Sequence, residues 1–150
     1  MNDAYAAIVM LIERLHRHFL DVLRAELRRL GVDDINAVQA LLLSNIGADE
    51  MVIRELKDRG YYQGSNVSYN IKKLTETGYL AQERSPHDRR ATILRLTDKG
   101  MQLCDNINEL QTHLSQTVEK AEGAISRLDE AGKTLQELER TWTDYIRYGR

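Results

Sequence analysis

Polar and basic side chains gather on one face of segment 65–77, in the middle of the chain. Apolar side chains recur there at Val67, Ile71 and Leu74, which is helical spacing, so a helix with that stripe facing inward is predicted. Ser65 is the predicted N-cap. The residues expected on the outer face are Ser65, Asn66, Ser68, Tyr69, Lys72 and Lys73. Their hydroxyl, amide and ammonium groups can hydrogen-bond to base edges or to phosphates, which is the chemistry of a helix in the major groove of DNA.

A second polar group lies between two segments of alternating polarity, 79–84 and 91–96. Such alternation on both sides of a turn-rich stretch predicts a two-stranded hairpin with a basic tip, after which Thr97 or Asp98 caps the next helix. The hairpin residues that could contact a polyanion are Arg84, His87, Asp88, Arg89 and Arg90. A thin hairpin can place an arginine in the minor groove, whose negative potential attracts guanidinium.

The charge of the chain is concentrated in the same region. The 150 residues include 21 Lys and Arg against 23 Asp and Glu, a net charge of -2. Between Arg54 and Arg95, however, nine basic residues face five acidic ones, which gives a local charge of +4. A mildly acidic protein can therefore still bind nucleic acid through its central segment.

Two short helices are expected before the polar helix. The first is predicted over 35–45, and the second lies within 49–59, where Asp49 is the chemically best N-cap, although the start can be a few residues later. A turn over 60–64 then leads into the polar helix. The residues of the first helix that are expected to face inward are Val38, Leu41 and Leu42.

Long helical arms flank this centre. The first is predicted over 3–30 with Gly31 as its stop, and the second over 98–146 with a joint at 128–132. The apolar stripe of the first arm is wider than a lone surface helix needs, so burial by a second chain is expected.

The predicted fold is mainly α with a small β-hairpin wing. A single domain over 1–150 is expected, in which 35–97 form a winged helix-turn-helix DNA-binding region. Residues 1–31 and 98–150 would then be the N- and C-terminal helical dimerisation arms.

Other classes of protein are disfavoured. The longest apolar run, Ala4 to Ile12, is far shorter than the roughly 20 residues of a membrane span, and Asp3 before it and Arg14 after it do not fit a secretory signal. The sequence has one cysteine, and no Gly-rich phosphate loop, HExxH or GxSxG motif. We therefore expect a cytoplasmic protein that is not an enzyme and holds no cofactor and no metal.

Three short motifs occur in order around the polar helix and the hairpin. They are Leu-x-x-x-Gly ending at Gly78, Ser-x-x-Asp-x-Arg over 85–90, and Leu-Thr-x-x-Gly over 96–100. In these motifs, and in its long terminal helices, the chain resembles the MarR family of bacterial transcription regulators. The segment Gly60-Tyr61-Tyr62-Gln63-Gly64 departs from the plainer turn of a typical member.

The resemblance implies a two-fold dimer on double-stranded DNA, with the two polar helices in successive major grooves and half-sites about 10 base pairs apart. It implies that Asp88 orients a neighbouring arginine and that Arg90, or else Arg89, enters the minor groove. It also implies a repressor of pseudo-palindromic operators, relieved by a small-molecule effector bound between the dimer helices and the winged domain.

Plainer interpretations of the same residues stand beside these. Lys72 and Lys73 can simply be part of a solvated helix face. An ion pair within the turn at Asp88, Arg89 and Arg90 would contribute little to stability. Arg84 can be a charged residue at the edge of the sheet. Cys104 is expected to be an inert helix residue, and His16 and His18 point about 200° apart on a helix and cannot share a metal. The alternative function is a winged-helix module that docks proteins, and it differs from a DNA binder in lacking salt-dependent affinity for duplex.

Overall fold

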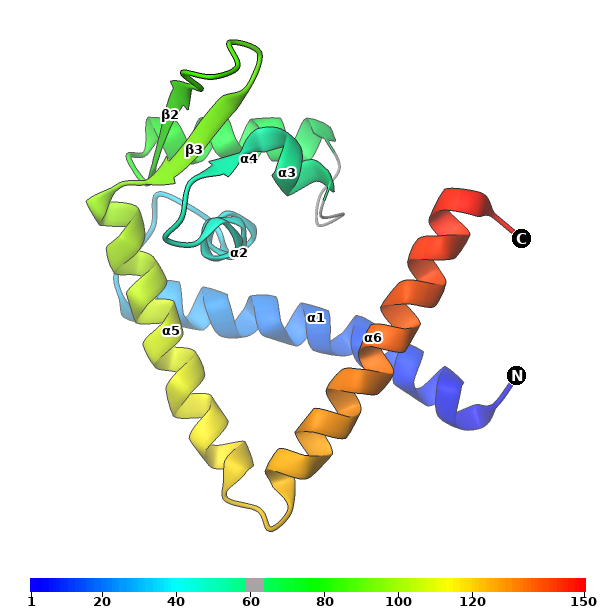
Figure 1. Cartoon of the computed structure of the whole chain (residues 1–150). Coiled ribbons are helices and arrows are strands. Elements are labelled where there is room, and N and C mark those ends of the chain that lie inside the picture. Colours follow the sequence, from blue (N-terminus) through cyan, green and yellow to red (C-terminus); the bar gives the residue numbers. More distant parts are fainter. Residues whose placement is uncertain (59–63) are drawn as a thin grey trace. The chain divides into compact units, whose positions relative to one another are not determined.

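Both polar segments lie in one folded unit, Met1–Leu110, of the computed structural model (Figure 1). The structure describes residues 1–58 and 64–150, with the backbone alone for residues 57, 58, 64 and 65. A second unit, Gln111–Arg150, contains the end of one helix and the whole of the next. The chain is mainly helical with a small antiparallel sheet, which confirms the predicted fold class.

Helix α1, Asp3–Arg29, is the predicted first arm. The Asn2 side chain caps it by accepting a hydrogen bond from the Ala4 N–H over 2.8 Å. Gly31 follows its end with φ +71°, a left-handed conformation that costs glycine little, so the predicted stop is confirmed. The buried residues of α1 gather near its C-terminal end, at Leu23, Glu26 and Leu27.

Helix α2, Ala37–Ile46, begins at a complete capping box. The Asn36 side chain accepts from the Gln39 N–H over 2.8 Å, and the Gln39 side chain accepts from the Asn36 N–H over 3.0 Å. The prediction that Val38 faces inward is wrong, because its side chain is 37% exposed. Apolar residues surround most of this helix, so their spacing alone does not show which side meets the core. Its most deeply buried residues are Ala40, Leu42 and Leu43.

A three-stranded antiparallel sheet in the order β1-β3-β2 carries the predicted hairpin. Strands β2, Leu80–Arg84, and β3, Thr92–Leu96, pair along their whole length, with Leu80 opposite Leu96. Strand β1, Met51–Val52, is not evident from the sequence, because two residues cannot display an alternating pattern. It lies within the range predicted for the second helix, so α3, Ile53–Asp58, begins a few residues after Asp49, at the later of the two predicted starts.

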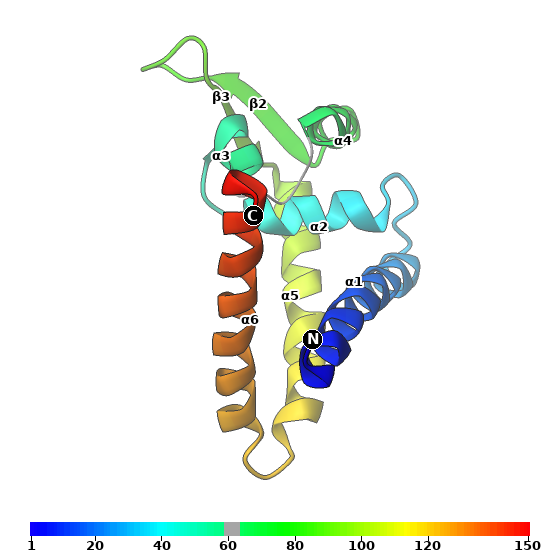
Figure 2. The ribbon, with the colours of Figure 1, turned by 90° about the vertical axis from the view of Figure 1, so that its right-hand side faces the viewer.

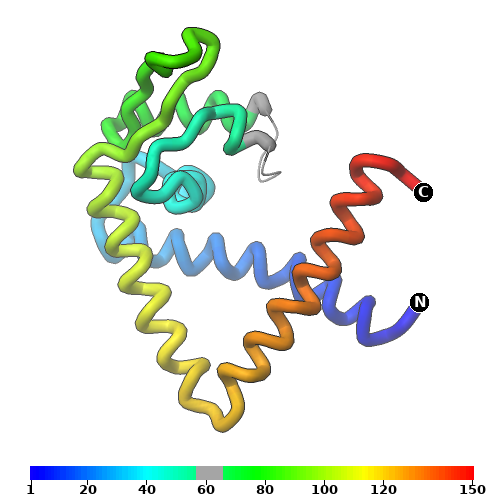
Figure 3. The backbone as a smooth tube through the Cα atoms, in the orientation of Figure 1, coloured from blue at the N-terminus to red at the C-terminus, as the bar shows by residue number. Residues whose placement is uncertain are grey.

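Helix α4, Gly64–Glu76, is the predicted polar helix. It begins one residue before Ser65, which therefore lies in the first turn and not at the predicted N-cap position. Most of the predicted turn before it falls on residues 59–63, which lie outside the described residues and are grey in Figure 3. Gly78 ends the helical segment with φ +86°, as predicted. The inward stripe is buried, as predicted, at Val67, Ile71 and Leu74.

The segment after α4 approaches the start of α5, Asp98–Glu119, very closely. The Tyr79 carbonyl accepts a hydrogen bond from the Thr97 N–H over 3.1 Å. A Cβ on Gly100 would overlap that carbonyl oxygen and lie 3.2 Å from its carbon. The Thr97 hydroxyl accepts from the Gly100 N–H over 3.2 Å, so Thr97 is the cap. The Leu-Thr-x-x-Gly motif thus has a local cause: its threonine caps the helix and its glycine leaves room for a backbone oxygen.

A polar cluster ties this junction to the segment before α2. The Tyr79 hydroxyl donates to one Asp34 oxygen over 2.8 Å, and the Lys99 ammonium donates to the other over 2.9 Å. The same ammonium lies 4.3 Å from the centre of the Tyr79 ring. Burial raises the pKa of Asp34, but the hydrogen bonds from Lys99 and Tyr79 outweigh it and hold that pKa below its usual value. Burial and the Asp34 carboxylate raise the pKa of Tyr79, so its hydroxyl stays a donor.

In the second unit, the end of α5 turns sharply into α6, Ala124–Tyr148 (Figure 3). Gly123 makes this turn with φ +72°. The predicted joint at 128–132 is wrong, because those residues continue α6. A glycine such as Gly132 costs only about 1 kcal/mol inside a helix, whereas the left-handed turn at Gly123 favours glycine strongly. None of the described helices is long and apolar enough to cross a membrane.

Gly100→Ala is expected to lower the free energy of unfolding by about 2–3 kcal/mol, because the added methyl group would meet backbone that cannot move aside. Denaturant unfolding followed by circular dichroism measures the change. Gly132→Ala is the matched control, since no atom lies within 4 Å of its Cβ position, and it should not destabilise the chain. Equal unfolding free energies for the Gly100 variant and the wild type would refute the close approach.

Candidate nucleic-acid interface

One face of α4 is polar and open to solvent. The side chains of Asn66, Ser68, Tyr69 and Lys72 are exposed, and that of Lys73 is partly buried. Tyr69 keeps 66% of its surface exposed. The structure therefore brings these predicted contact residues together on the side of the helix away from the core, while the Ser65 side chain lies outside the described part of the chain.

The opposite face of α4 is held by a buried polar contact as well as by its apolar stripe. Asn70 is only 8% exposed, and its side-chain oxygen accepts a hydrogen bond from the Gln39 amide over 3.3 Å. Because Gln39 also closes the capping box of α2, one side chain connects the start of α2 to the middle of α4. Asn70 is not among the predicted contact or core residues, although its position three residues after Val67 places it on the inward face.

The tip of the β2–β3 hairpin is a tight turn with exposed side chains. Figure 2 shows the hairpin projecting outward, with α4 seen nearly end-on beside its base. The Ser85 hydroxyl accepts from the backbone N–H groups of His87 and Asp88 at 3.3 and 3.4 Å, and the Ala91 N–H donates to the Asp88 carbonyl over 3.0 Å. The predicted contact residues exposed on the hairpin are Arg84, His87, Asp88, Arg89 and Arg90.

The Asp88 carboxylate stabilises the backbone of this tip. It accepts a hydrogen bond from the Arg90 N–H over 3.0 Å, which is an Asx-turn. The serine and the aspartate of the Ser-x-x-Asp-x-Arg motif thus both shape the turn that presents the arginines. Contact between this carboxylate and a guanidinium stays a prediction.

The wing is also linked directly to α4. The Gln82 side chain, on β2, donates to the Thr75 hydroxyl over 2.8 Å, and that hydroxyl donates to the Ile71 carbonyl over 2.7 Å. A side-chain hydrogen bond therefore connects the hairpin to the C-terminal part of α4. Sequence reasoning did not find Gln82, because a lone amide in an exposed strand carries no spacing signal.

Similarity to known proteins agrees with this geometry. Residues 35–100 match a family model described as a winged helix DNA-binding domain. Over 145 residues the chain is 38% identical to the exopolysaccharide II synthesis transcriptional activator ExpG of Rhizobium meliloti, covering 97% of this chain and 75% of ExpG. A MarR transcriptional regulator from Methanosarcina mazei Go1 shares the fold with a TM-score of 0.77, at 17% identity over 91% of this chain and 99% of that one. The chain belongs to the MarR family of transcriptional regulators.

A second similar structure was solved together with DNA. Streptococcus pneumoniae FabT in complex with DNA aligns with a TM-score of 0.75, at 22% identity, over 93% of this chain and 98% of that one. The fold and the relatives of this MarR-family chain are those of transcriptional regulators and not of enzymes.

Ion pairs remove one arginine from the basic surface of this MarR-family wing. Arg95, on β3, pairs with Glu50 and also with Glu83, the latter at 2.7 Å. The hydrogen bond to Glu50 and the charge of Glu83 raise the pKa of Arg95 above its usual value. The positive charge available to a partner therefore lies nearer the tip than a count along the sequence suggests.

Cys104, which is predicted to be an inert helix residue, is shielded from solvent. Cys104 is buried in α5, and burial raises the pKa of its thiol, which disfavours the reactive thiolate. No group of three metal-ligating side chains occurs among residues 1–58 and 64–150.

Asp88→Asn keeps a side-chain oxygen that can accept from the Arg90 N–H, so its affinity for duplex DNA is expected to stay within about threefold of wild type. Asp88→Ala removes the acceptor and should weaken binding at least fivefold, roughly the value of one hydrogen bond. Fluorescence anisotropy with a labelled duplex from the upstream region of the gene measures both. Equal, large losses in the two variants would instead assign the role to the negative charge of Asp88.

Proposed function

We propose that this MarR-family chain binds specific sites in double-stranded DNA as a homodimer. The observation that carries the proposal is the exposed polar face of α4 beside an exposed cationic hairpin tip, with both elements tied into one folded unit. An α-helix fits the major groove, where Asn66 and Tyr69 would contact base edges and Lys72 and Lys73 the phosphates. The proposed contact residues are Ser65, Asn66, Ser68, Tyr69, Lys72, Lys73, Arg84, His87, Asp88, Arg89 and Arg90.

The wing tip supplies the second contact. Arg89 and Arg90 are exposed next to a turn that hydrogen bonds stabilise, so an arginine can enter the minor groove with little loss of backbone freedom. Arg84, at the other end of the turn, is proposed to contact a phosphate. The fold that this chain shares with FabT supports the arrangement, since FabT is solved in complex with DNA.

Apolar surface on both helical arms supports the homodimer. On α6, the side chains of Ile125, Leu128, Leu135 and Ile146 are between 44% and 81% exposed. The N-terminal part of α1 exposes further apolar residues, at Tyr5, Met10, Leu11 and Leu15. So many exposed apolar side chains on two helices are uncommon on a monomer, and a second copy of the chain would cover them.

The direction of regulation has two candidates. The resemblance to the family favours a repressor that a small-molecule effector releases by shifting the dimer between two conformations. ExpG, 38% identical, is named a transcriptional activator, which favours activation as the second candidate. A reporter driven by the bound promoter, compared in cells with and without this protein, separates the two, because repression lowers and activation raises its output.

Arg90→Ala is expected to weaken binding to the DNA site at least tenfold while the protein stays dimeric, because the tip loses a groove or phosphate contact. Affinity is measured by anisotropy over a series of salt concentrations, in which the wild type should show a steep decrease with rising salt. Arg140→Ala, which removes the same charge from α6, is the control. A wild-type affinity that does not depend on salt would favour the protein-docking alternative, and unchanged affinity of the Arg90 variant would disprove the wing contact.

Ile146→Asp is expected to dissociate the dimer, because its side chain, 81% exposed in the single chain, would carry a charge into the proposed interface. Size-exclusion chromatography with light scattering gives the mass. Thr141→Asp places the same charge on another side of α6 and should leave the dimer intact. A dimer that survives Ile146→Asp would rule out this face of α6 as the interface.

A further inference from the structure

A hollow of about 460 Å³ lies between the start of α3 and the wing. Arg54 lines it from α3, and Asp88 and Arg90 line it from the hairpin. Arg54 is absent from the contact residues predicted above, because a single arginine in a short helix carries no spacing signal. Two cationic residues from separate elements thus line one depression.

The charges in this hollow are available to a ligand. In the described part of the chain, neither Arg54 nor Arg90 takes part in an ion pair, whereas Arg95 on β3 pairs with two carboxylates. The Asp88 carboxylate already accepts the Arg90 N–H. Two guanidinium groups against one carboxylate leave a net positive charge, which selects an anion.

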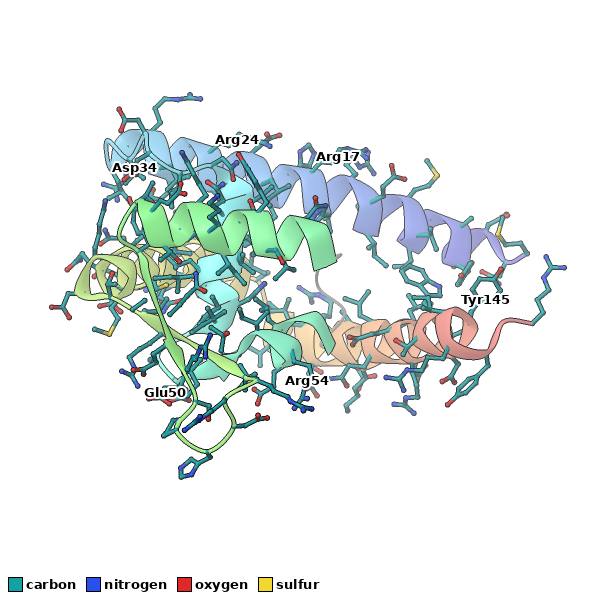
Figure 4. The ribbon with its side chains drawn as sticks, turned by 90° about the horizontal axis from the view of Figure 1, so that it is seen from above. Arg17, Arg24, Asp34, Glu50, Arg54 and Tyr145 are labelled. Atoms are coloured by element: carbon teal, nitrogen blue, oxygen red, sulfur yellow. The ribbon has the colours of Figure 1, made fainter. Side chains whose placement is uncertain are left out.

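The hollow opens near the surface proposed to meet DNA. Viewed from above, Arg54 lies on α3 beside the hairpin, and α4 runs across the same view (Figure 4). In helix-turn-helix proteins the helix before the recognition helix crosses the DNA backbone. With α4 in the major groove, α3 and the hairpin would therefore face neighbouring phosphates.

We infer that this hollow binds one phosphate group of the DNA backbone, held jointly by Arg54 from α3 and Arg90 from the wing. The inference rests on the proposed function and extends it by one residue and one subsite. The planar guanidinium group matches the oxygens of a phosphate and can donate two hydrogen bonds to it. Arg90 is thereby assigned to a phosphate of the DNA backbone, and Arg89 is the arginine that would enter the minor groove.

Neutral methylphosphonate linkages, placed one at a time along the bound duplex, test the shared phosphate. Wild-type protein is expected to lose about fivefold or more in affinity at one position in each half-site. Arg54→Gln and Arg90→Gln should each bind unmodified DNA less well and lose less affinity than the wild type at that same position. Arg54→Gln should also reduce the slope of log affinity against log salt by about one per protomer.

Arg140→Gln, on α6, controls for loss of a charge and should keep the wild-type methylphosphonate profile. Wild-type affinity of Arg54→Gln, or loss of sensitivity at different phosphates in the two variants, would overturn the shared site while leaving DNA binding intact. Failure of the wild type itself to bind duplex would overturn the proposed function and this inference together. Low-millimolar inorganic phosphate, at constant ionic strength, should affect wild type and Arg54→Gln equally, and selective competition against the wild type would assign the hollow to a free anion instead.

Discussion

The close contact between the Tyr79 carbonyl and the start of α5 is the constraint on which the winged unit depends. One backbone oxygen accepts the Thr97 N–H and occupies the space that a side chain at position 100 would need. The same junction is tied through Asp34 to the segment before α2. Because α4 ends immediately before this junction, these contacts fix its C-terminal end, while its buried stripe and the hydrogen bond between Gln39 and Asn70 determine which face points outward.

The distribution of charged side chains determines which part of the winged region can attract a polyanion. The chain as a whole is slightly negative, yet its central segment carries an excess of positive charge. Pairing of Arg95 with Glu50 and Glu83 neutralises the base of the wing. Within the described part of the winged region, Arg54, Arg89 and Arg90 take part in no ion pair, so positive charge remains available at the hairpin tip and on α3.

The parts of the fold that the sequence predicts well are those with a repeated local signal. The stripe of Val67, Ile71 and Leu74 located α4, and the alternation on both sides of 85–90 located the hairpin. The outward residues of α4 followed from the same stripe, since a helix with one buried face must expose the other.

The features that the sequence did not predict lack such a signal. Strand β1 is two residues long, Val38 lies in a helix that is apolar on most sides, and the joint before α6 depends on which of two glycines adopts a positive φ. Asn70 and Gln82 form hydrogen bonds to other elements, and Arg54 lines a hollow together with residues of the hairpin. Their roles follow from tertiary contacts that no local pattern encodes.

The hydrogen bond from Gln82 to Thr75 has a consequence for target choice. It connects the hairpin to the helix, so a change in their separation that breaks it would cost about 1 kcal/mol. The less the separation of hairpin and helix changes, the more the DNA must bend or twist to fit them. The free energy of that deformation depends on the base-pair steps of the DNA. Preference among operators would then depend partly on the flexibility of base pairs that no side chain touches.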